Sequence, residues 1–290
     1  MQKEYKENHC WQYEIRLKNF QQDLIDYNLS NNEILDLKIT DFSFEYIPKE
    51  NKNVFSEAKK FIEKNEWLGK LSNYPTHLFI TRYKDILAGV VFMDMPNAFS
   101  SLLGSNTRKL ERLISRGACI SWSPKNLASA LIMWSIKWMV KNTDYRLFTA
   151  YSDPEAKELG TIYQACNFIY LGQNSGTSKM YLAPNGQWTS DRYFRSRSIY
   201  KRIAKNNNIE WNPEWQKGDI IVWEKVPAGI EKILREESKL LQKSCECKIQ
   251  PKKHKYCYIL GKDNRETKYL RKEFERLNPK LVNLPYPKNR

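Results

Sequence analysis

The 290-residue sequence is poor in the residues on which metal centres and disulfide scaffolds depend, with 3 histidines and 6 cysteines. The spacing of Cys245 and Cys247 is too tight for a zinc-ribbon pair, even with His254 and Cys257 nearby, and favours thiols in a polar linker. No apolar signal region precedes these cysteines, so we expect reduced thiols and a cytoplasmic protein. The sequence therefore predicts no metal site.

Long hydrophobic runs are also lacking. The most apolar stretch covers residues 127–140 and contains Ser129, Ser135 and Lys137, whereas a bilayer span needs about twenty apolar residues. We therefore expect no membrane association.

What the sequence has in excess is positive charge. Its 48 Lys and Arg exceed its 33 Asp and Glu, which gives a net charge of +15 and favours a polyanionic partner. A hydrophobic content of 41% is enough for a packed core and excludes wholesale disorder. One large domain or two smaller ones are expected for this length.

Helix and strand patterns alternate through the middle of the chain. Apolar periodicity and β-branched enrichment predict helices at 54–65, 127–140 and 155–166, and strands at 77–83, 86–93, 115–122, 147–151 and 168–171. Alternation of this kind predicts an α/β (α+β) fold, with one mixed sheet over residues 60–182 and helices on both of its faces.

One turn in this pattern could hold a phosphate. Ser123 and Pro124 form a helix-start signal directly after a predicted strand, and backbone N–H groups at such a start favour anions. We therefore predict that residues 123–127, including Ser123, Lys125, Asn126 and Leu127, bind a pyrophosphate. The alternative is an ordinary α/β turn, since no glycine-rich loop accompanies it.

The next predicted helix resembles part of a known superfamily. Ala156 followed by residues 162–168, Ile-Tyr-Gln-Ala-Cys-Asn-Phe, is similar to a helix and its exit in the GNAT acyltransferases. The resemblance implies an acyl-CoA donor, with acetyl-CoA as the usual example, and makes Tyr163 the phenol that protonates a departing thiolate. Core packing is the alternative role for a tyrosine beside aliphatic residues.

Within that superfamily, residues 60–172 resemble the bacteriophage Mom-type DNA modification proteins more closely. The matching stretches are Ser115-Arg116, Pro124, Asn126, Ser129, Tyr151-Ser152-Asp153-Pro154 and Gly160-Thr161-Ile162-Tyr163-Gln164-Ala165. The resemblance implies a GNAT-like mixed central sheet flanked by helices, and adds Ser129 to the cofactor-binding residues. It also implies conversion of the exocyclic amine of adenine to a carbamoylmethyl derivative, which protects phage DNA from host restriction.

The resemblance leaves two aspects of the chemistry open. A histidine-containing stretch expected before the first hairpin reads Asn-Glu-Trp-Leu-Gly at residues 65–69, which puts a metal role in doubt. Simple acetyl transfer does not give a carbamoylmethyl product, so the donor is not settled.

Two further residues have candidate catalytic roles. Arg116 opens the strand before the phosphate turn, where its guanidinium could bind a phosphate or carboxylate, or only form a surface ion pair. Asp153 follows a strand end, where it could accept a proton from a base amine or only cap the next helix.

The last third of the sequence is basic and aromatic. We predict that Arg192, Arg195, Arg197, Tyr200, Lys201 and Arg202 bind DNA, because cations neutralise phosphates and rings stack on bases. An ordinary solvated helix face is the alternative. Modification of adenine would require an extruded base or a single strand.

These patterns suggest three regions and three functions. The regions are an N-terminal extension at 1–53, a catalytic domain at 54–185, and a basic DNA-binding extension at 186–290. A DNA adenine modification enzyme is favoured over an acetyltransferase for protein or small-molecule amines, which would not need the basic extension. A non-catalytic DNA-binding protein is the third possibility. The sequence does not determine the oligomeric state.

Overall fold

The computed structural model describes residues 10–71, 75–96, 100–174, 176 and 179–288. The chain forms two compact units: a central unit of residues 1–175 with 253–290, and an inserted unit of residues 176–252. The boundaries expected at 53 and 185 are not those of the units. The reason is that strands from both ends of the chain, β1 (Phe42–Ile47) and β12 (His254–Ile259), belong to the central sheet.

The central unit is built on a seven-stranded sheet with the order β1-β2-β3-β4-β5-β12-β6. The further strands are β2 (His77–Tyr83), β3 (Ile86–Asp94), β4 (Glu111–Cys119), β5 (Leu147–Ser152) and β6 (Ile169–Tyr170). Neighbours are antiparallel except β4 and β5, which are parallel. The predicted mixed α/β sheet is therefore confirmed.

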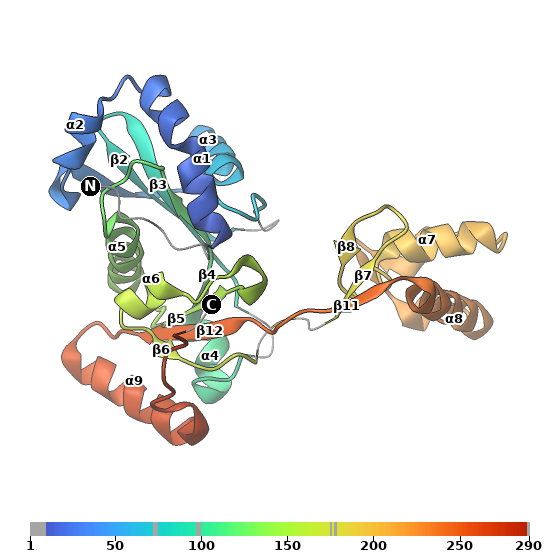
Figure 1. The fold of residues 1–290 in the computed structure, drawn as a ribbon. Coiled ribbons are helices and arrows are strands. Elements are labelled where there is room, and N and C mark those ends of the chain that lie inside the picture. The colour runs from blue at the N-terminus through green and yellow to red at the C-terminus, as the bar shows by residue number, and fades with distance from the viewer. Residues whose placement is uncertain (1–9, 72–74, 97–99, 175, 177–178, 289–290) are drawn as a thin grey trace. The chain divides into compact units, whose positions relative to one another are not determined.

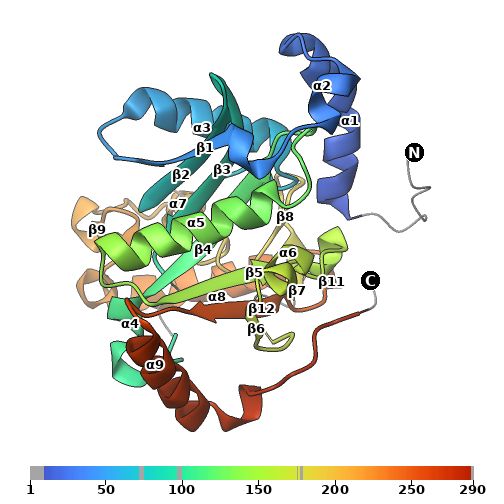
Figure 2. The ribbon, with the colours of Figure 1, turned by 90° about the vertical axis from the view of Figure 1, so that its left-hand side faces the viewer.

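Helices cover both faces of this sheet, as Figures 1 and 2 show. Leu78 and Ile80 pack in one core with α3 (Lys52–Asn65), whereas Phe79 between them packs in the other with α5 (Leu127–Asn142). Alternation of neighbours between two cores is what the two-residue period of a strand produces. The helix α9 (Asn264–Leu277) packs against β12.

The other helices of the central unit are short or lie near its ends. They are α1 (Trp11–Asp26), α2 (Asn31–Leu35), α4 (Thr107–Leu110) and α6 (Thr161–Ala165), with 3-10 turns at Ile39–Asp41, Gly104–Asn106, Pro154–Ala156 and Pro279–Leu281. α1 packs on α3. None of the helices that the structure describes has both the length and the apolar character needed to cross a bilayer.

The structure corrects the sequence-based elements in three places. The predicted strand at 115–122 begins earlier and is β4. The helix predicted at 155–166 is interrupted, because Lys157 and Gly160 have φ values of 56° and 69° in the left-handed region, and only α6 is helical. Residues 179–182 form β7, which lies outside the central sheet.

The inserted unit has its own small core. Its strands are β7 (Lys179–Leu182), β8 (Trp188–Thr189), β9 (Gln216–Lys217), β10 (Ile220–Ile221) and β11 (Cys247–Ile249), and its helices are α7 (Arg197–Asn206) and α8 (Ala228–Ser244). Two 3-10 turns cover Pro213–Trp215 and Trp223–Lys225. α7 packs on α8, and Ile199, Ile203 and Leu234 are buried between the elements.

Candidate active site

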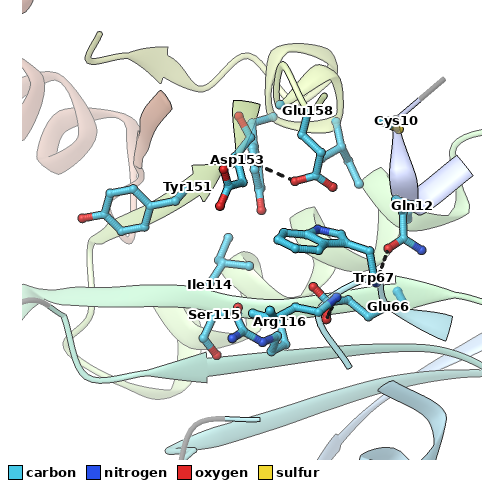
Figure 3. A pocket seen from close by; sticks show the side chains of 18 of the residues that line it. Cys10, Gln12, Glu66, Trp67, Ile114, Ser115, Arg116, Tyr151, Asp153 and Glu158 are labelled. Atoms are coloured by element: carbon cyan, nitrogen blue, oxygen red, sulfur yellow. Dashed lines mark hydrogen bonds between the residues drawn. The ribbon is translucent and has the colours of Figure 1, made fainter. Parts of the chain in front are cut away.

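A cavity of about 500 Å³ lies where β4 and β5 separate. The two strands pair only over residues 111–114 and 147–150; beyond these, β4 pairs with β3 and β5 pairs with β12. The separated strand ends, the start of α6, residues 66–68 and the beginning of α1 line the cavity (Figure 3). A ligand at this place would face the edges of β4 and β5 that no longer pair with each other.

All three residues predicted to be catalytic line this cavity. Arg116 comes from β4, Asp153 follows β5 and Tyr163 lies in α6. The fold thus brings together residues that are up to 47 positions apart in the sequence.

Asp153 is engaged by the protein through both carboxylate oxygens. Oδ1 accepts a hydrogen bond from the backbone N–H of Glu155 at 3.1 Å, and Oδ2 lies 2.8 Å from Nζ of Lys253. Asp153 is 9% exposed. It therefore caps the following 3-10 turn, as the alternative interpretation of the sequence suggested.

A second carboxylate, Glu158, lies beside Asp153 and was missed by the sequence analysis. Its Oε2 accepts a hydrogen bond from the backbone N–H of Asp153 at 3.5 Å (Figure 3). Burial raises the pKa of Glu158 to about 7, and the negative charges of Glu66 and Asp153 add to this. Glu158 is therefore partly protonated near neutral pH.

A third carboxylate, Glu66, is held at the opposite wall. Its Oε2 accepts the backbone N–H groups of Leu68 at 3.1 Å and Gly69 at 2.9 Å. Burial raises the pKa of Glu66, and the nearby Arg116 opposes the rise. Arg116 itself donates through Nε to the carbonyl of Lys70 at 2.5 Å, which fixes the guanidinium at the cavity wall.

Tyr163 is a protonated phenol in this site. Burial, followed by the charge of Glu158, raises its pKa above the usual 10. Its ring packs against Phe168 and Tyr256, with centroids 5.4 and 5.5 Å apart. The phenol can therefore donate a proton, and the ring also has the packing role that was the alternative.

The cavity also holds a thiol, Cys119, at the end of β4. Burial raises the pKa of Cys119 to about 12, so the reactive thiolate is not formed at neutral pH. A covalent enzyme intermediate on Cys119 is therefore disfavoured.

The N-terminal helix completes the cavity, which the sequence did not predict. Gln12 accepts a hydrogen bond from the backbone N–H of Trp67 at 3.2 Å through Oε1. Arg16 donates to the carbonyls of Ser121 at 3.0 Å and Ser123 at 2.8 Å, and to the Ser123 hydroxyl at 3.2 Å. α1 thus fixes the turn that leads into α5.

The predicted cofactor-binding residues lie at the start of α5 beside this cavity. Ser123 is buried and bonded to Arg16, and the side chain of Leu127 is fully buried. Lys125 and Asn126 are exposed, and the Ser129 hydroxyl donates to the carbonyl of Asn126 at 2.9 Å. Only Ala128 of this segment lines the cavity, so a ligand would meet backbone N–H groups rather than most of these side chains.

The predicted DNA-binding residues lie in the inserted unit and differ in their surroundings. Arg192, Lys201 and Arg202 are exposed, whereas Arg195 pairs with Asp191 and Arg197 with Asp219. Tyr200 is 4% exposed and packs on Trp223 with centroids 5.1 Å apart. The ring of Tyr200 thus belongs to the core of the inserted unit and is not free in this structure to stack on a base.

Within the described ranges, no group of three or more metal-binding side chains is close enough to hold an ion. Cys245 and Cys247 belong to the inserted unit, whereas His254 and Cys257 are in β12 of the central sheet. His254 Nδ1 lies 2.7 Å from the Tyr170 hydroxyl.

Comparison with known proteins gives a family and a set of distant structures. The model of the Mom protein family matches residues 52–288, which is most of the chain. No curated protein matches. An N-acetyltransferase from Staphylococcus aureus Mu50 is 14% identical, covering 51% of this chain and 92% of that chain, with a TM-score of 0.35.

Two other solved structures are similarly distant. The ribosomal-protein alpha-N-acetyltransferase RimL is 10% identical, covering 77% of this chain and 95% of that chain, with a TM-score of 0.35. A chain of the NatC complex, in a structure bound to Gag peptide and CoA, is 15% identical, covering 50% and 92%, with a TM-score of 0.32. Similarities this distant transfer no activity to the present chain.

Proposed function

Because the chain belongs to the Mom protein family, we propose that it modifies the exocyclic amine of adenine in DNA, with a product of the carbamoylmethyl type. The convergence of Arg116, Asp153 and Tyr163 in one cavity at the separated ends of β4 and β5 supports this proposal most directly. The same cavity would serve an acetyltransferase for other amines, so the choice of DNA depends on family membership and on the net charge of +15.

The acid–base groups of the cavity suit attack by an amine. An amine must lose a proton as it forms a new bond, and a departing thiolate must gain one. Carboxylates at the cavity wall can accept the first proton, and the protonated Tyr163 can supply the second. Arg116 would hold an anionic group of either substrate against β4.

An acyl-CoA-type donor fits the residues at the start of α5. The first N–H groups of an α-helix have no partner within the helix, and no side chain caps those of α5. The backbone of Ala128 and Ser129 would bind the pyrophosphate, with Lys125 beside it in solvent. When bound, such a donor supplies an activated thioester carbon.

Mass spectrometry of nucleosides tests this function. DNA from cells expressing the wild-type protein should contain a modified deoxyadenosine that is absent from cells expressing Tyr163→Phe. The mass of the adduct distinguishes an acyl from a carbamoylmethyl group. Unmodified deoxyadenosine together with acetylated protein or small-molecule amines would instead identify an acetyltransferase of other substrates.

A further inference from the structure

Two carboxyl groups of the cavity, Asp153 and Glu158, are neighbours with different surroundings (Figure 3). The two oxygens of Asp153 accept from Glu155 N–H and pair with Lys253. The Lys253 ammonium, 2.8 Å from Oδ2, keeps that oxygen in an ion pair within the protein. Asp153 is thus occupied in holding the start of the 3-10 turn and the segment before β12.

Glu158 forms no ion pair with a cation among the residues that the structure describes. Its Oε2 accepts the backbone N–H of Asp153 at 3.5 Å, a long hydrogen bond, and the side chain of Trp67 is a further hydrogen-bond partner that lies alongside it. The other charged residues that line the cavity are Arg16, Glu66, Asp94, Arg116, Asp153 and Lys253. Of these, Glu66 and Asp153 act on Glu158 as like charges, so its neutral form is favoured more than that of a surface glutamate.

The backbone around Glu158 aims this carboxyl at the site. Lys157 before it and Gly160 after it have left-handed backbone conformations, which turn the chain sharply between the 3-10 turn and α6. Glu158 and Tyr163 consequently line the same cavity from adjoining segments. A proton acceptor and a proton donor are thereby placed on one wall.

We propose that Glu158, rather than Asp153, is the general base that deprotonates the attacking amine, an inference that rests on the proposed function. Glu158 takes the proton that the amine nitrogen loses while its lone pair bonds to the carbonyl carbon of a thioester-class donor, so this step leaves an acyl group on the amine and does not by itself give the carbamoylmethyl group. Tyr163 gives its proton to the sulfur, which leaves with the electrons of the broken carbon–sulfur bond. Solvent water returns both side chains to their starting states. Asp153 is a positioning residue that holds the backbone N–H bonded to Glu158.

The test compares Glu158→Gln, Asp153→Asn and the control Glu63→Gln, an exposed carboxyl on α3. Glu158→Gln should lower kcat for adenine modification by about a hundredfold to ten-thousandfold, with KM for DNA nearly unchanged. It should also remove the acid limb of the pH–rate profile, expected near the pKa of about 7. Asp153→Asn should keep that limb, moved to a lower pH by the lost charge, and lose about fivefold in rate, the scale of one partly exposed ion pair.

A second readout uses the free enzyme. Infrared difference spectra between pH 5 and pH 9 should show a protonated carboxyl that titrates near 7 in the wild type, that titrates at a lower pH in Asp153→Asn because one neighbouring negative charge is gone, and that is absent from Glu158→Gln. If Glu158→Gln does not fold, Glu158→Asp keeps a carboxyl and should retain the acid limb at a reduced rate.

The outcomes separate the inference from the proposed function. A wild-type protein that yields no modified deoxyadenosine overturns the proposed function, and this assignment with it. If the wild-type protein modifies adenine, the proposed function stands. The assignment of Glu158 alone is then overturned if Glu158→Gln works at the wild-type rate and Asp153→Asn loses the acid limb.

Discussion

The two units of the chain place their charged residues in different surroundings. In the central unit, Arg116, Asp153 and Glu158 line a cavity, and burial shifts the pKa of Glu158 to about 7. In the inserted unit, the aromatic Tyr200 forms the core while Arg192 and Arg202 remain exposed. The cavity of the central unit is therefore suited to proton transfer, and the inserted unit offers surface charge.

This difference in burial shows how ionisable residues of the two units come to have different functions. Desolvation raises the pKa of a buried carboxyl or phenol and so prepares it for acid–base chemistry. An exposed arginine keeps its ordinary charge and can only attract a polyanion, with a strength that falls as salt rises. Changes in the central unit should therefore affect catalysis and stability, and changes in the inserted unit should affect salt-dependent affinity.

The largest effect is expected for Tyr163→Phe. The phenylalanine ring can keep the contacts with Phe168 and Tyr256, so the substitution removes only the hydroxyl. Loss of a general acid should lower adenine modification by about a hundredfold to ten-thousandfold, measured by nucleoside mass spectrometry. DNA affinity and the melting temperature serve as controls and should stay unchanged. A fully active variant would leave Tyr163 with the packing role alone.

The next effect is on the stability of the central unit. Gly160 has a φ of 69°, and an added Cβ would lie 2.5 Å from Cε2 of Tyr256. Gly160→Ala should therefore lower the free energy of unfolding by about 3 kcal/mol, from backbone strain and overpacking together. Gly186→Ala is the matched control in the inserted unit, because its φ is 77° with no atom within 4 Å of the new Cβ. It should cost about 1 kcal/mol in a denaturant titration. Equal losses would contradict a crowded turn at Gly160.

The sequence predicted those elements that depend on local signals. Ser123-Pro124 marks the approach to α5, and the residues flanking Lys84 form the hairpin of β2 and β3. It did not predict β12, because a strand that inserts between β5 and β6 from about 100 residues away leaves no local trace of its partners. Glu158 was missed for a related reason, since its burial depends on Trp67 and on the separation of β4 and β5.

The sequence did contain a signal that would have placed Tyr200 correctly. Ile199, Tyr200, Ile203 and Ala204 follow the spacing of one helix face, and all four are buried. A basic composition masked this pattern, because the arginines and lysines of α7 lie on the other face of the same helix.

A smaller effect is expected on the pH dependence of stability. The pKa of Glu158 is raised from 4.5 to about 7, so between these values the folded state holds a proton that the unfolded state has lost. The contribution of Glu158 to the free energy of unfolding therefore falls as pH rises from 4.5 to 7. Glu158→Gln should remove this fall and gain about 3 kcal/mol relative to the wild type between pH 4 and pH 8, measured by urea unfolding. If the free energies of unfolding of Glu158→Gln and the wild type differ by the same amount throughout that pH range, the pKa of Glu158 is not raised in the folded state.

The smallest effect per residue is expected at the surface of the inserted unit. Each phosphate contact contributes about one unit to the slope of log affinity against log salt, or roughly fourfold in affinity between 50 and 200 mM salt. Arg192, Lys201 and Arg202 are exposed, and Lys201 lies over the Trp211 ring at 5.6 Å. Their combined replacement by Ala should flatten the slope by about three units.

Replacement of Arg195 and Arg197 should flatten the slope by less than two units, because these arginines already pair with Asp191 and Asp219. Fluorescence anisotropy with a DNA duplex at several salt concentrations measures both slopes. If the triple variant keeps the parental slope, these side chains are only a solvated surface, and DNA binding must be sought among the basic residues of the central unit, such as those of α9.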